Sequence, residues 1–272
     1  MEKLHIMCNL FERQLQIIDG LMLGDGTLER RKPTHNASLK VHRCLRDISY
    51  RNWLAKELSS LLTPKSCYEN EIFDKRTNRK YYHASFRSKC CPCLTPIYDR
   101  WYPNGIKSIP SDLKLNPLTL AVWFADDGSL YNPTNYALDM KFATHGFTAA
   151  DVERLKDILQ DYTRREFRVY YEKGQPTIRG FSDASRAVLR IIDDVFPSLD
   201  RKSEIWRANN YRLFHGKPIK PVCPRCTIGK VYSYGRTRKG VQKFKCVSCM
   251  HAFQSQYERS MHNVYYPTLS RP

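Results

Sequence analysis

Two segments of the sequence finish in the same way, with an apolar run that ends in an aspartate followed at once by a glycine. The first reads Ile18-Asp-Gly-Leu-Met-Leu-Gly-Asp25-Gly26, and the second reads Leu120-Ala-Val-Trp-Phe-Ala-Asp-Asp127-Gly128. Glycine is the usual residue just past a helix end, so both runs are predicted to be helices. If these helices pack side by side, their two carboxylates meet at one end and form an oxygen site suited to Mg²⁺.

Such a site would support hydrolysis of a phosphodiester. Divalent ions about 4 Å apart activate a water and stabilise the leaving oxygen, while nearby cations balance the added negative charge. Gly24 and Asp126 stand directly before the two acids, and the predicted Mg²⁺ group is Asp25, Gly24, Asp127 and Asp126. A single Asp-Gly pair is usually only a helix stop, so it is the repetition that favours a functional site.

The residues one turn apart on these runs bear on how closely the helices approach. Gly20 and Gly24 share one face of the first run and would admit a neighbouring helix. The second run carries Val122 and Asp126 at the matching places, so we expect the close packing to depend on the two glycines. Asp126 is interpreted as a solvated charge at a helix end, with an assisting role beside the metal as the alternative.

Four cysteines near the C-terminus have the spacing of a structural zinc site. Cys223-Pro-Arg-Cys226 and Cys246-Val-Ser-Cys249 are separated by nineteen residues, and two such pairs complete a closed tetrahedral Cys₄ site. Strand patterns at Gly229–Tyr234 and Gln242–Lys245 lie between the pairs, which predicts a zinc ribbon. A zinc site without a role in DNA binding is the alternative, and a redox pair is disfavoured because no thioredoxin-like unit surrounds it.

A second group of cysteines, Cys90-Cys91-Pro-Cys93, carries a much weaker signal. Only Cys67 or His83 would complete a metal site with it, so we expect buried or surface thiols there. The ten cysteines of the chain are therefore interpreted as metal ligands and thiols of a reducing compartment, not as a disulfide scaffold.

The elements around the two Asp-Gly pairs follow one order. The first stretch predicts helices at Gln14–Asp25, Ile48–Leu62 and Thr95–Trp101, with strands at Ser38–Arg43 and Tyr81–Arg87. The second predicts helices at Pro117–Asp127, Ala149–Tyr162 and Ser185–Val195, with strands at Tyr136–Ala143, Phe167–Tyr171 and Thr177–Gly180. Both stretches are interpreted as the order α-β-β-α-β-β-α, although fewer than four strands are recognised in each. This predicts an α+β fold of two pseudo-symmetric repeats at 1–112 and 113–214, followed by the ribbon at 215–272.

The charge of the chain favours a polyanionic partner. Lys and Arg number 45 against 27 Asp and Glu, a formal net charge of +18. The segment 215–272 alone holds eleven Lys or Arg against one acid. No run is apolar enough to span a membrane and no signal peptide is recognised, so we expect a cytoplasmic, nucleoid-associated or organellar protein that is not secreted.

Together these features resemble the LAGLIDADG family of homing endonucleases. The resemblance is carried over residues 11–210 by the two Asp-Gly runs and by Trp101-Tyr-Pro-Asn104, Lys107-Ser-Ile-Pro110 and Thr144-His-Gly-Phe147. It implies a monomeric, Mg²⁺-dependent endonuclease that cuts a long asymmetric duplex site and leaves cohesive 3′ ends. It also implies catalytic roles for Asp25 and Asp127, with Lys107 and Lys202 where similar proteins carry an active-site lysine.

The resemblance further implies that a curved antiparallel sheet from each repeat, like a saddle, lies in the DNA major groove. Basic and aromatic residues in or beside the predicted strands are then candidates for phosphate or base contacts. These candidates are Lys40, His42, Arg43, Arg79, Lys80, His83, Arg87, Lys141, Arg168, Tyr170, Lys173 and Arg179, with Arg236, Arg238, Lys239, Lys243 and Lys245 in the ribbon.

Two other functions remain compatible with the sequence. The same fold serves RNA maturases, which bind intron RNA and assist splicing, and a non-catalytic DNA-binding regulator would keep the fold without the chemistry. The intact pair Asp25 and Asp127 favours the enzyme over both. The chain shows no self-splicing ends, so an intron-encoded or free-standing gene is expected, not an intein.

Overall fold

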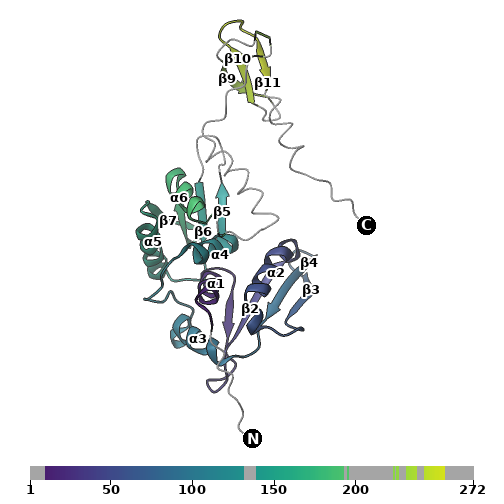
Figure 1. Ribbon diagram of the computed structural model, residues 1–272, viewed down its shortest axis with the longest axis vertical. Helices are drawn as coiled ribbons and strands as arrows, with labels where there is room; N and C mark the ends of the chain where they lie inside the picture. The colour runs from purple at the N-terminus through teal and green to yellow at the C-terminus, as the bar shows by residue number, and fades with distance from the viewer. Residues whose placement is uncertain are drawn as a thin grey trace. The chain divides into compact units, whose positions relative to one another are not determined.

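The computed structural model describes residues 10–131, 139–192, 195, 223, 225–226, 231–237 and 242–254. The chain divides into two compact units, residues 1–214 and 215–272 (Figure 1). Within the part of the chain that the structure describes, no helix is long and apolar enough to cross a membrane.

The first unit contains two repeats with one order of elements, in agreement with the predicted α+β fold. The first repeat consists of α1 (Glu12–Leu23), β1 (Thr27–Glu29), β2 (Ser38–Cys44), α2 (Ile48–Glu57), β3 (Cys67–Asp74), β4 (Arg79–Arg87) and α3 (Thr95–Trp101). The second consists of α4 (Pro117–Asp127), β5 (Gly128–Tyr131), β6 (Asp139–Ala143), α5 (Ala149–Thr163), β7 (Phe167–Glu172), β8 (Gln175–Gly180) and α6 (Ser182–Ile192). Short 3₁₀ turns lie at Leu45–Asp47, Ser59–Leu61, Pro92–Leu94 and Pro103–Gly105.

Each repeat forms a four-stranded antiparallel sheet, and the two sheets have the same strand order. The first sheet runs β1-β2-β4-β3 and the second runs β5-β6-β8-β7. The β7–β8 hairpin turns at Lys173 and Gly174, both with positive φ, as a two-residue turn between antiparallel strands requires. Lys173 is therefore a turn residue and not part of a strand.

The core of the first unit lies where α1 and α4 pack against each other and against the sheets. Ile17, Ile18, Leu21, Leu120 and Trp123 are fully buried, and α1 and α4 lie side by side (Figure 1). A side-chain hydrogen bond to the backbone marks the start of each helix. Gln14 accepts from the Phe11 N–H at 3.2 Å at the start of α1, and Asn116 accepts from the Thr119 N–H at 2.9 Å at the start of α4.

Several strands lack a clear signal in the sequence. β1 and β5 are short and directly follow the Asp-Gly pairs, where glycine suggests only a turn. β3 was not predicted because its hairpin with β4 extends past the core, so Ile72 and Phe73 are both exposed and apolar residues do not alternate with polar ones. The helix predicted to reach Leu62 ends at Glu57, and a 3₁₀ turn at Ser59–Leu61 follows it. The helix predicted at 185–195 starts three residues earlier, at Ser182.

The second unit carries a three-stranded antiparallel sheet. Its strands are β9 (Val231–Arg236), β10 (Gln242–Cys246) and β11 (Ala252–Gln254), in the order β11-β10-β9. Cys223 and Cys246 are fully buried beside Val231. The two predicted strands are present, and β11 adds a third.

Candidate functional site

The two motif helices, α1 and α4, touch at the residues that lack side chains. A Cβ on Gly20 would lie 2.7 Å from the Val122 Cβ, and a Cβ on Gly24 would lie 2.3 Å from the Asp126 Cβ. Real Cβ atoms do not approach so closely, so glycine is required at both places for this packing. The prediction that close approach depends on these two glycines is confirmed.

The ends of the two helices are tied together by a hydrogen bond. The backbone N–H of Asp25 donates to Asp126 Oδ2 at 3.0 Å. The Asp25 side chain is 46% exposed, and Asp127 is partly buried at the end of α4. Both acids act electrostatically on the same ammonium group, that of Lys107. The structure therefore brings Asp25, Asp127 and Lys107 to one end of the helix pair.

Lys107 lies in the segment that connects the repeats, and its ammonium points to the end of α1. Its Nζ lies 3.4 Å from the Gly24 carbonyl oxygen, 3.2 Å from the Gly26 carbonyl oxygen and 5.4 Å from the centre of the Phe147 ring. Burial lowers the pKa of Lys107 to about 8, although the charges of Asp127 and Asp25 act in the opposite direction. The predicted partner Lys202 lies outside the described residues.

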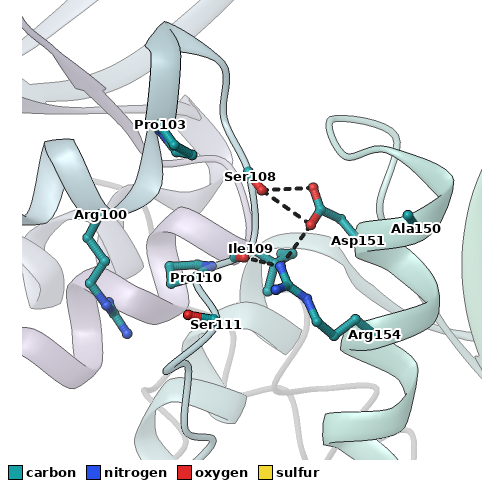
Figure 2. A pocket seen from close by; sticks show the side chains of 9 residues that line it. All are labelled: Arg100, Pro103, Ser108, Ile109, Pro110, Ser111, Ala150, Asp151 and Arg154. Atoms are coloured by element: carbon teal, nitrogen blue, oxygen red, sulfur yellow. Dashed lines mark hydrogen bonds and ion pairs between the residues drawn. The ribbon is translucent and has the colours of Figure 1, made fainter.

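The segment that carries Lys107 is fixed to the second repeat. Ser108 donates to the two carboxylate oxygens of Asp151 at 3.1 and 3.2 Å, and Arg154 bonds both Asp151 and the Ile109 carbonyl oxygen (Figure 2). These residues line a surface pocket of about 590 Å³ at the start of α5. Their contacts hold the connecting segment in place, and neither Ser108 nor Asp151 was predicted, because hydroxyls and helix-start acids are common on any surface.

A buried cation stands beside Asp25 in the first repeat. Arg43 of β2 forms ion pairs with the carboxylates of Asp25 and Asp126, and its guanidinium lies 5.0 Å from the centre of the Tyr50 ring. The Tyr50 hydroxyl donates to Asp126 Oδ1 at 2.9 Å, and burial raises the pKa of that hydroxyl. The Arg43 side chain is only 6% exposed and that of Asp126 is fully buried.

This network corrects two predictions. Asp126 is not a solvated helix-end charge, because its Oδ1 is bonded by Tyr50 and Arg43 and its Oδ2 by the Asp25 N–H. Arg43 does not face a groove with the other strand cations, because it shares the inward side of β2 with Leu39 and Val41. Tyr50, which bridges the two, carried no signal that distinguishes it from other tyrosines of an amphipathic helix.

The atoms at this end of the helix pair fit a hard divalent cation. The available groups are the Asp25 and Asp127 carboxylates with the Gly24 and Gly26 carbonyl oxygens, and two of these oxygens already contact the Lys107 ammonium. Oxygen ligands on partly exposed carboxylates are those that Mg²⁺ prefers, because it retains several waters.

Comparisons with known proteins show the family of this chain. The model of the LAGLIDADG DNA endonuclease family matches residues 15–188. The chain belongs to this family. An uncharacterized protein of Methanocaldococcus jannaschii is 29% identical over 206 residues, which cover 70% of this chain and 72% of that protein.

An RNA maturase and a homing endonuclease are also similar to parts of this chain. A cytochrome b mRNA maturase of Saccharomyces cerevisiae is 30% identical over 158 residues, 54% of this chain but only 36% of the maturase. The structure of the homing endonuclease I-WcaI bound to its DNA recognition sequence matches with a TM-score of 0.64 at 18% identity, over 69% of this chain and 84% of that one. At this identity the structural match shows the LAGLIDADG fold alone.

The sheets of this LAGLIDADG protein each have one face turned away from the core, here called the open face. On the first sheet this face carries Lys40, His42, Arg79, His83 and Arg87; on the second it carries Lys141, Arg168, Tyr170 and Arg179. Lys80 lies on the opposite side of β4, where its Nζ is 2.9 Å from Glu71 Oε1, and its contact with DNA stays a prediction.

The open faces also hold acids that were not predicted. Glu29 forms an ion pair with Arg87 and lies 3.8 Å from Lys40 Nζ, and Glu172 forms ion pairs with Lys141 and Arg179. Hydrogen bonds from those two cations lower the pKa of Glu172. His42 and His83 stack with their ring centres 4.1 Å apart, and burial lowers the pKa of His42.

The second unit brings its four cysteines together as the spacing predicted. The Sγ atoms of Cys223, Cys226, Cys246 and Cys249 all lie within 4.8 Å of one another, with the Cys223–Cys249 and Cys226–Cys246 pairs at 3.5 Å. Tetrahedral zinc with bonds of about 2.3 Å places its sulfur ligands at about this separation. Lys243 and Lys245 lie on β10 and Arg236 ends β9, whereas Arg238 and Lys239 lie outside the described residues.

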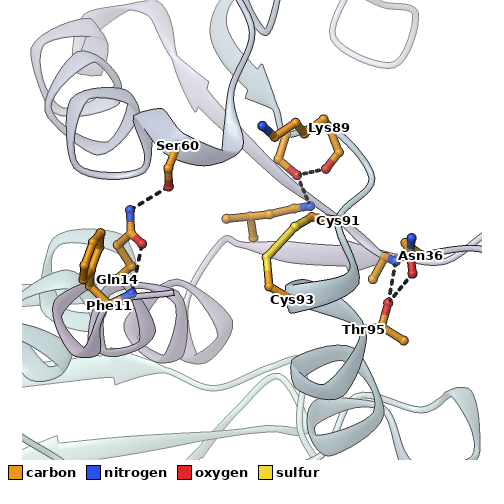
Figure 3. The surroundings of a disulfide bond; sticks show 11 residues. Phe11, Gln14, Asn36, Ser60, Lys89, Cys91, Cys93 and Thr95 are labelled. Carbon is orange, nitrogen blue, oxygen red and sulfur yellow. Dashed lines mark hydrogen bonds between the residues drawn. A yellow bond between two sulfur atoms is a disulfide. The ribbon is translucent and has the colours of Figure 1, made fainter. Parts of the chain in front are cut away.

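The other cysteine group does not form a metal site in the described part of the chain. Cys91 and Cys93 are joined by a disulfide and Cys90 is exposed (Figure 3). The expectation of free thiols is wrong for this pair. The backbone around this disulfide is also hydrogen-bonded to Ala37. The Cys91 N–H donates to the Ala37 carbonyl oxygen at 3.0 Å, and the Ala37 N–H donates to Thr95 Oγ1 at 3.2 Å.

Proposed function

We propose that this protein is a site-specific DNA endonuclease that cuts both strands of a duplex with divalent ions held by Asp25 and Asp127. The observation that carries the proposal is the meeting of these two acids and the Lys107 ammonium at one end of the paired motif helices. A regulator that only binds DNA has no use for a buried lysine near two acids, because phosphate contacts are made by exposed cations.

The roles of the residues follow from their positions. Mg²⁺ bound at Asp25, Asp127 and the Gly24 carbonyl oxygen would supply the activation of a water and the stabilisation of the leaving oxygen. Arg43 and Asp126 hold the Asp25 carboxylate and backbone in one orientation. Lys107, with Lys202 as its proposed counterpart, places positive charge where the phosphodiester gains negative charge.

The substrate in this proposal is a long duplex site read by the open faces of the two sheets. The two faces differ in sequence and in strand length, with β4 nine residues long and β8 six, so one chain would recognise an asymmetric site as a monomer. Strands in a major groove place alternate side chains on base edges and phosphates. Cleavage of the two strands across the adjacent minor groove would leave cohesive 3′ ends, as the resemblance to the family implies.

The second unit is proposed to bind one zinc ion structurally. A unit with three short strands buries little apolar surface, so bound metal would provide much of its folding free energy. Its excess of Lys and Arg favours a contact with nucleic acid. We expect the protein in a compartment with nucleic acid, either a cytoplasm or an organelle.

The test is cleavage of a randomised duplex library by the purified full-length protein with and without Mg²⁺. Wild type should give Mg²⁺-dependent cuts with cohesive ends. Asp25→Asn and Asp127→Asn should lose at least about a thousandfold in rate, or leave nicks, because each removes an anionic metal ligand. Asp157→Asn is the matched control, since this α5 acid is 62% exposed and far along the helix from its start.

The second candidate function is assistance to RNA splicing, favoured by the similarity to cytochrome b mRNA maturases. It predicts that the library is not cut and that a structured intron RNA is bound with equal affinity by wild type and by Asp25→Asn. Sequence-specific duplex binding without any cut would instead support a regulator.

A further inference from the structure

One face of the second unit presents two tyrosines that its own core does not use. Tyr232 and Tyr234 alternate along β9 and are 39% and 46% exposed, with ring centres 6.4 Å apart in an edge-to-face arrangement. Val231 points to the other side, where it is buried with Cys223 and Cys246. The side of the sheet that carries the cysteines therefore forms the core of the ribbon, and the side that carries the tyrosines is exposed to solvent.

Two lysines of the neighbouring strand share this face. Lys245 pairs with Tyr232 across the sheet, and its Nζ lies 5.0 Å from the centre of the Tyr234 ring. The Nζ of Lys243 lies 5.8 Å from the same ring. The opposite side of β10 instead carries Phe244, whose ring centre is 6.1 Å from that of Phe253. The face formed by Tyr232, Tyr234, Lys243 and Lys245 is here called the tyrosine–lysine face.

This combination of groups has a specific chemical complement. Exposed aromatic rings offer flat surfaces on which unpaired bases stack, and adjacent ammonium groups contact the phosphates that link those bases. In a duplex the base surfaces are already stacked on one another, so a duplex would use the lysines but not the rings. The rings therefore distinguish a single strand from a duplex.

We propose that the tyrosine–lysine face binds single-stranded nucleic acid by stacking unpaired bases on Tyr232 and Tyr234. The inference goes beyond the proposed cleavage of duplex DNA and does not depend on it; it requires only that the ribbon is folded. Stacking of a base on a ring and contact of an ammonium group with a phosphate are available to DNA and RNA alike, so single strands of both should bind with similar affinity.

The first experiment measures binding of a fluorescent twelve-nucleotide strand to the full-length protein by anisotropy, without Mg²⁺ so that nothing is cut. The Tyr232→Leu/Tyr234→Leu variant should bind at least about tenfold more weakly, because leucine offers no flat ring on which a base can stack. Tyr232→Phe/Tyr234→Phe keeps the rings and should bind like wild type. Tyr171→Leu removes a tyrosine of the first unit that is 62% exposed, and it should leave the affinity for the strand unchanged.

A second measurement identifies the contact directly. A strand containing 5-iodouridine is irradiated with the wild-type protein, and the crosslinked peptides are identified by mass spectrometry. Crosslinks at Tyr232 or Tyr234 are expected. They would support the proposal even if the leucine variant loses zinc and unfolds, because they are measured on the wild-type protein. Unchanged affinity of a zinc-loaded leucine variant would overturn the proposal, and so would an equal loss of duplex binding. Duplex cleavage by the same variant reports on the proposed endonuclease separately.

Discussion

The two repeats of the first unit use one scaffold but differ in what they place beside their acids. Their sheets have the same strand order, and the two acids follow equivalent helices: Asp25 lies two residues past the end of α1, and Asp127 is the last residue of α4. The residue before the acid is Gly24 in one and Asp126 in the other. The position that holds Arg43 in β2 corresponds to Thr144 after β6, where the side chain donates to the Pro176 carbonyl oxygen at 2.7 Å.

This difference shows how a symmetric fold acquires an asymmetric site. A glycine on one helix leaves room for the carboxylate of the other, and that carboxylate then needs a cation because it is fully buried. Arg43 supplies the cation and at the same time fixes Asp25. The second repeat has only a neutral hydrogen bond at the matching position, so its acid is held by different means.

The largest effect on stability is expected where the buried charge lies. Asp126→Asn should reduce the free energy of unfolding by about 3 kcal/mol, because it leaves Arg43 buried with one fewer anion. Thr144→Val, at the position in the second repeat that matches Arg43, should reduce it by only about 1 kcal/mol through loss of one hydrogen bond. Urea unfolding of both variants measures the difference.

The double variant Arg43→Met/Asp126→Leu is the control for this comparison. Removing both charges should restore part of the stability lost in Asp126→Asn, because no buried charge is left without a partner. Equal losses of unfolding free energy in Asp126→Asn and Thr144→Val would contradict the proposed difference between the buried ion pair of one repeat and the neutral hydrogen bond of the other.

Lys107 should have an effect on stability whose size depends on pH. Its pKa of about 8 in the folded protein is below the ordinary 10.5, so the folded state releases the proton first and wild-type stability rises between pH 8 and 10.5. In metal-free solution Lys107→Met should therefore be more stable than wild type at pH 7 by about 2 kcal/mol, with the gain shrinking through that range.

The same variant separates stability from activity. Lys107→Met should cut DNA much more slowly at pH 7 despite its greater stability, whereas the exposed Lys114→Met should change neither property. A variant that is less stable at pH 7 and unchanged in rate would mean that Lys107 serves packing against Phe147 and not the site.

The helix contact offers a smaller test of the same asymmetry. Gly20→Ala should destabilise the protein by about 1–3 kcal/mol, because the new Cβ would meet the Val122 Cβ and the Thr119 carbonyl oxygen. Val122→Ala alone should destabilise it by removing buried methyl groups. The double variant should lose less stability than the sum of the losses in the two single variants, since the smaller side chain at position 122 makes room for the new methyl at position 20. Full additivity, measured by urea unfolding, would place the two residues out of contact.

The helices and the two Asp-Gly pairs were predictable from sequence because their signals are local, whereas β1, β3, β5 and β11 gave no clear signal. Pro117 and Gly128 mark both ends of α4, and the CxxC pairs specify their own ligand set. The repetition of the Asp-Gly ending then identified Asp25 and Asp127 as partners.

The surroundings of the acids were not predictable for a physical reason. Arg43 alternates with Lys40 and His42 in a strand, and sequence alone does not say which side meets the core. Asp126 looks exposed at a helix end until the opposing helix presents Gly24 to it. Such pairings depend on contacts between residues about a hundred positions apart, as the bond from Asp25 to Asp126 illustrates.

The smallest expected effect concerns the acid on each open face. Glu172→Gln should release Lys141 and Arg179 for phosphates, and Glu29→Gln should do the same for Arg87 and Lys40. Each change should strengthen duplex binding severalfold at low salt. It should also steepen the salt dependence by up to about two units of slope, since each added phosphate contact contributes about one.

Binding measured over a range of salt concentrations tests both repeats, with the exposed Glu153→Gln of α5 as the control. A steeper slope in only one variant would show that the duplex engages one sheet more closely than the other, and weaker binding would mean that the glutamate itself contacts a base.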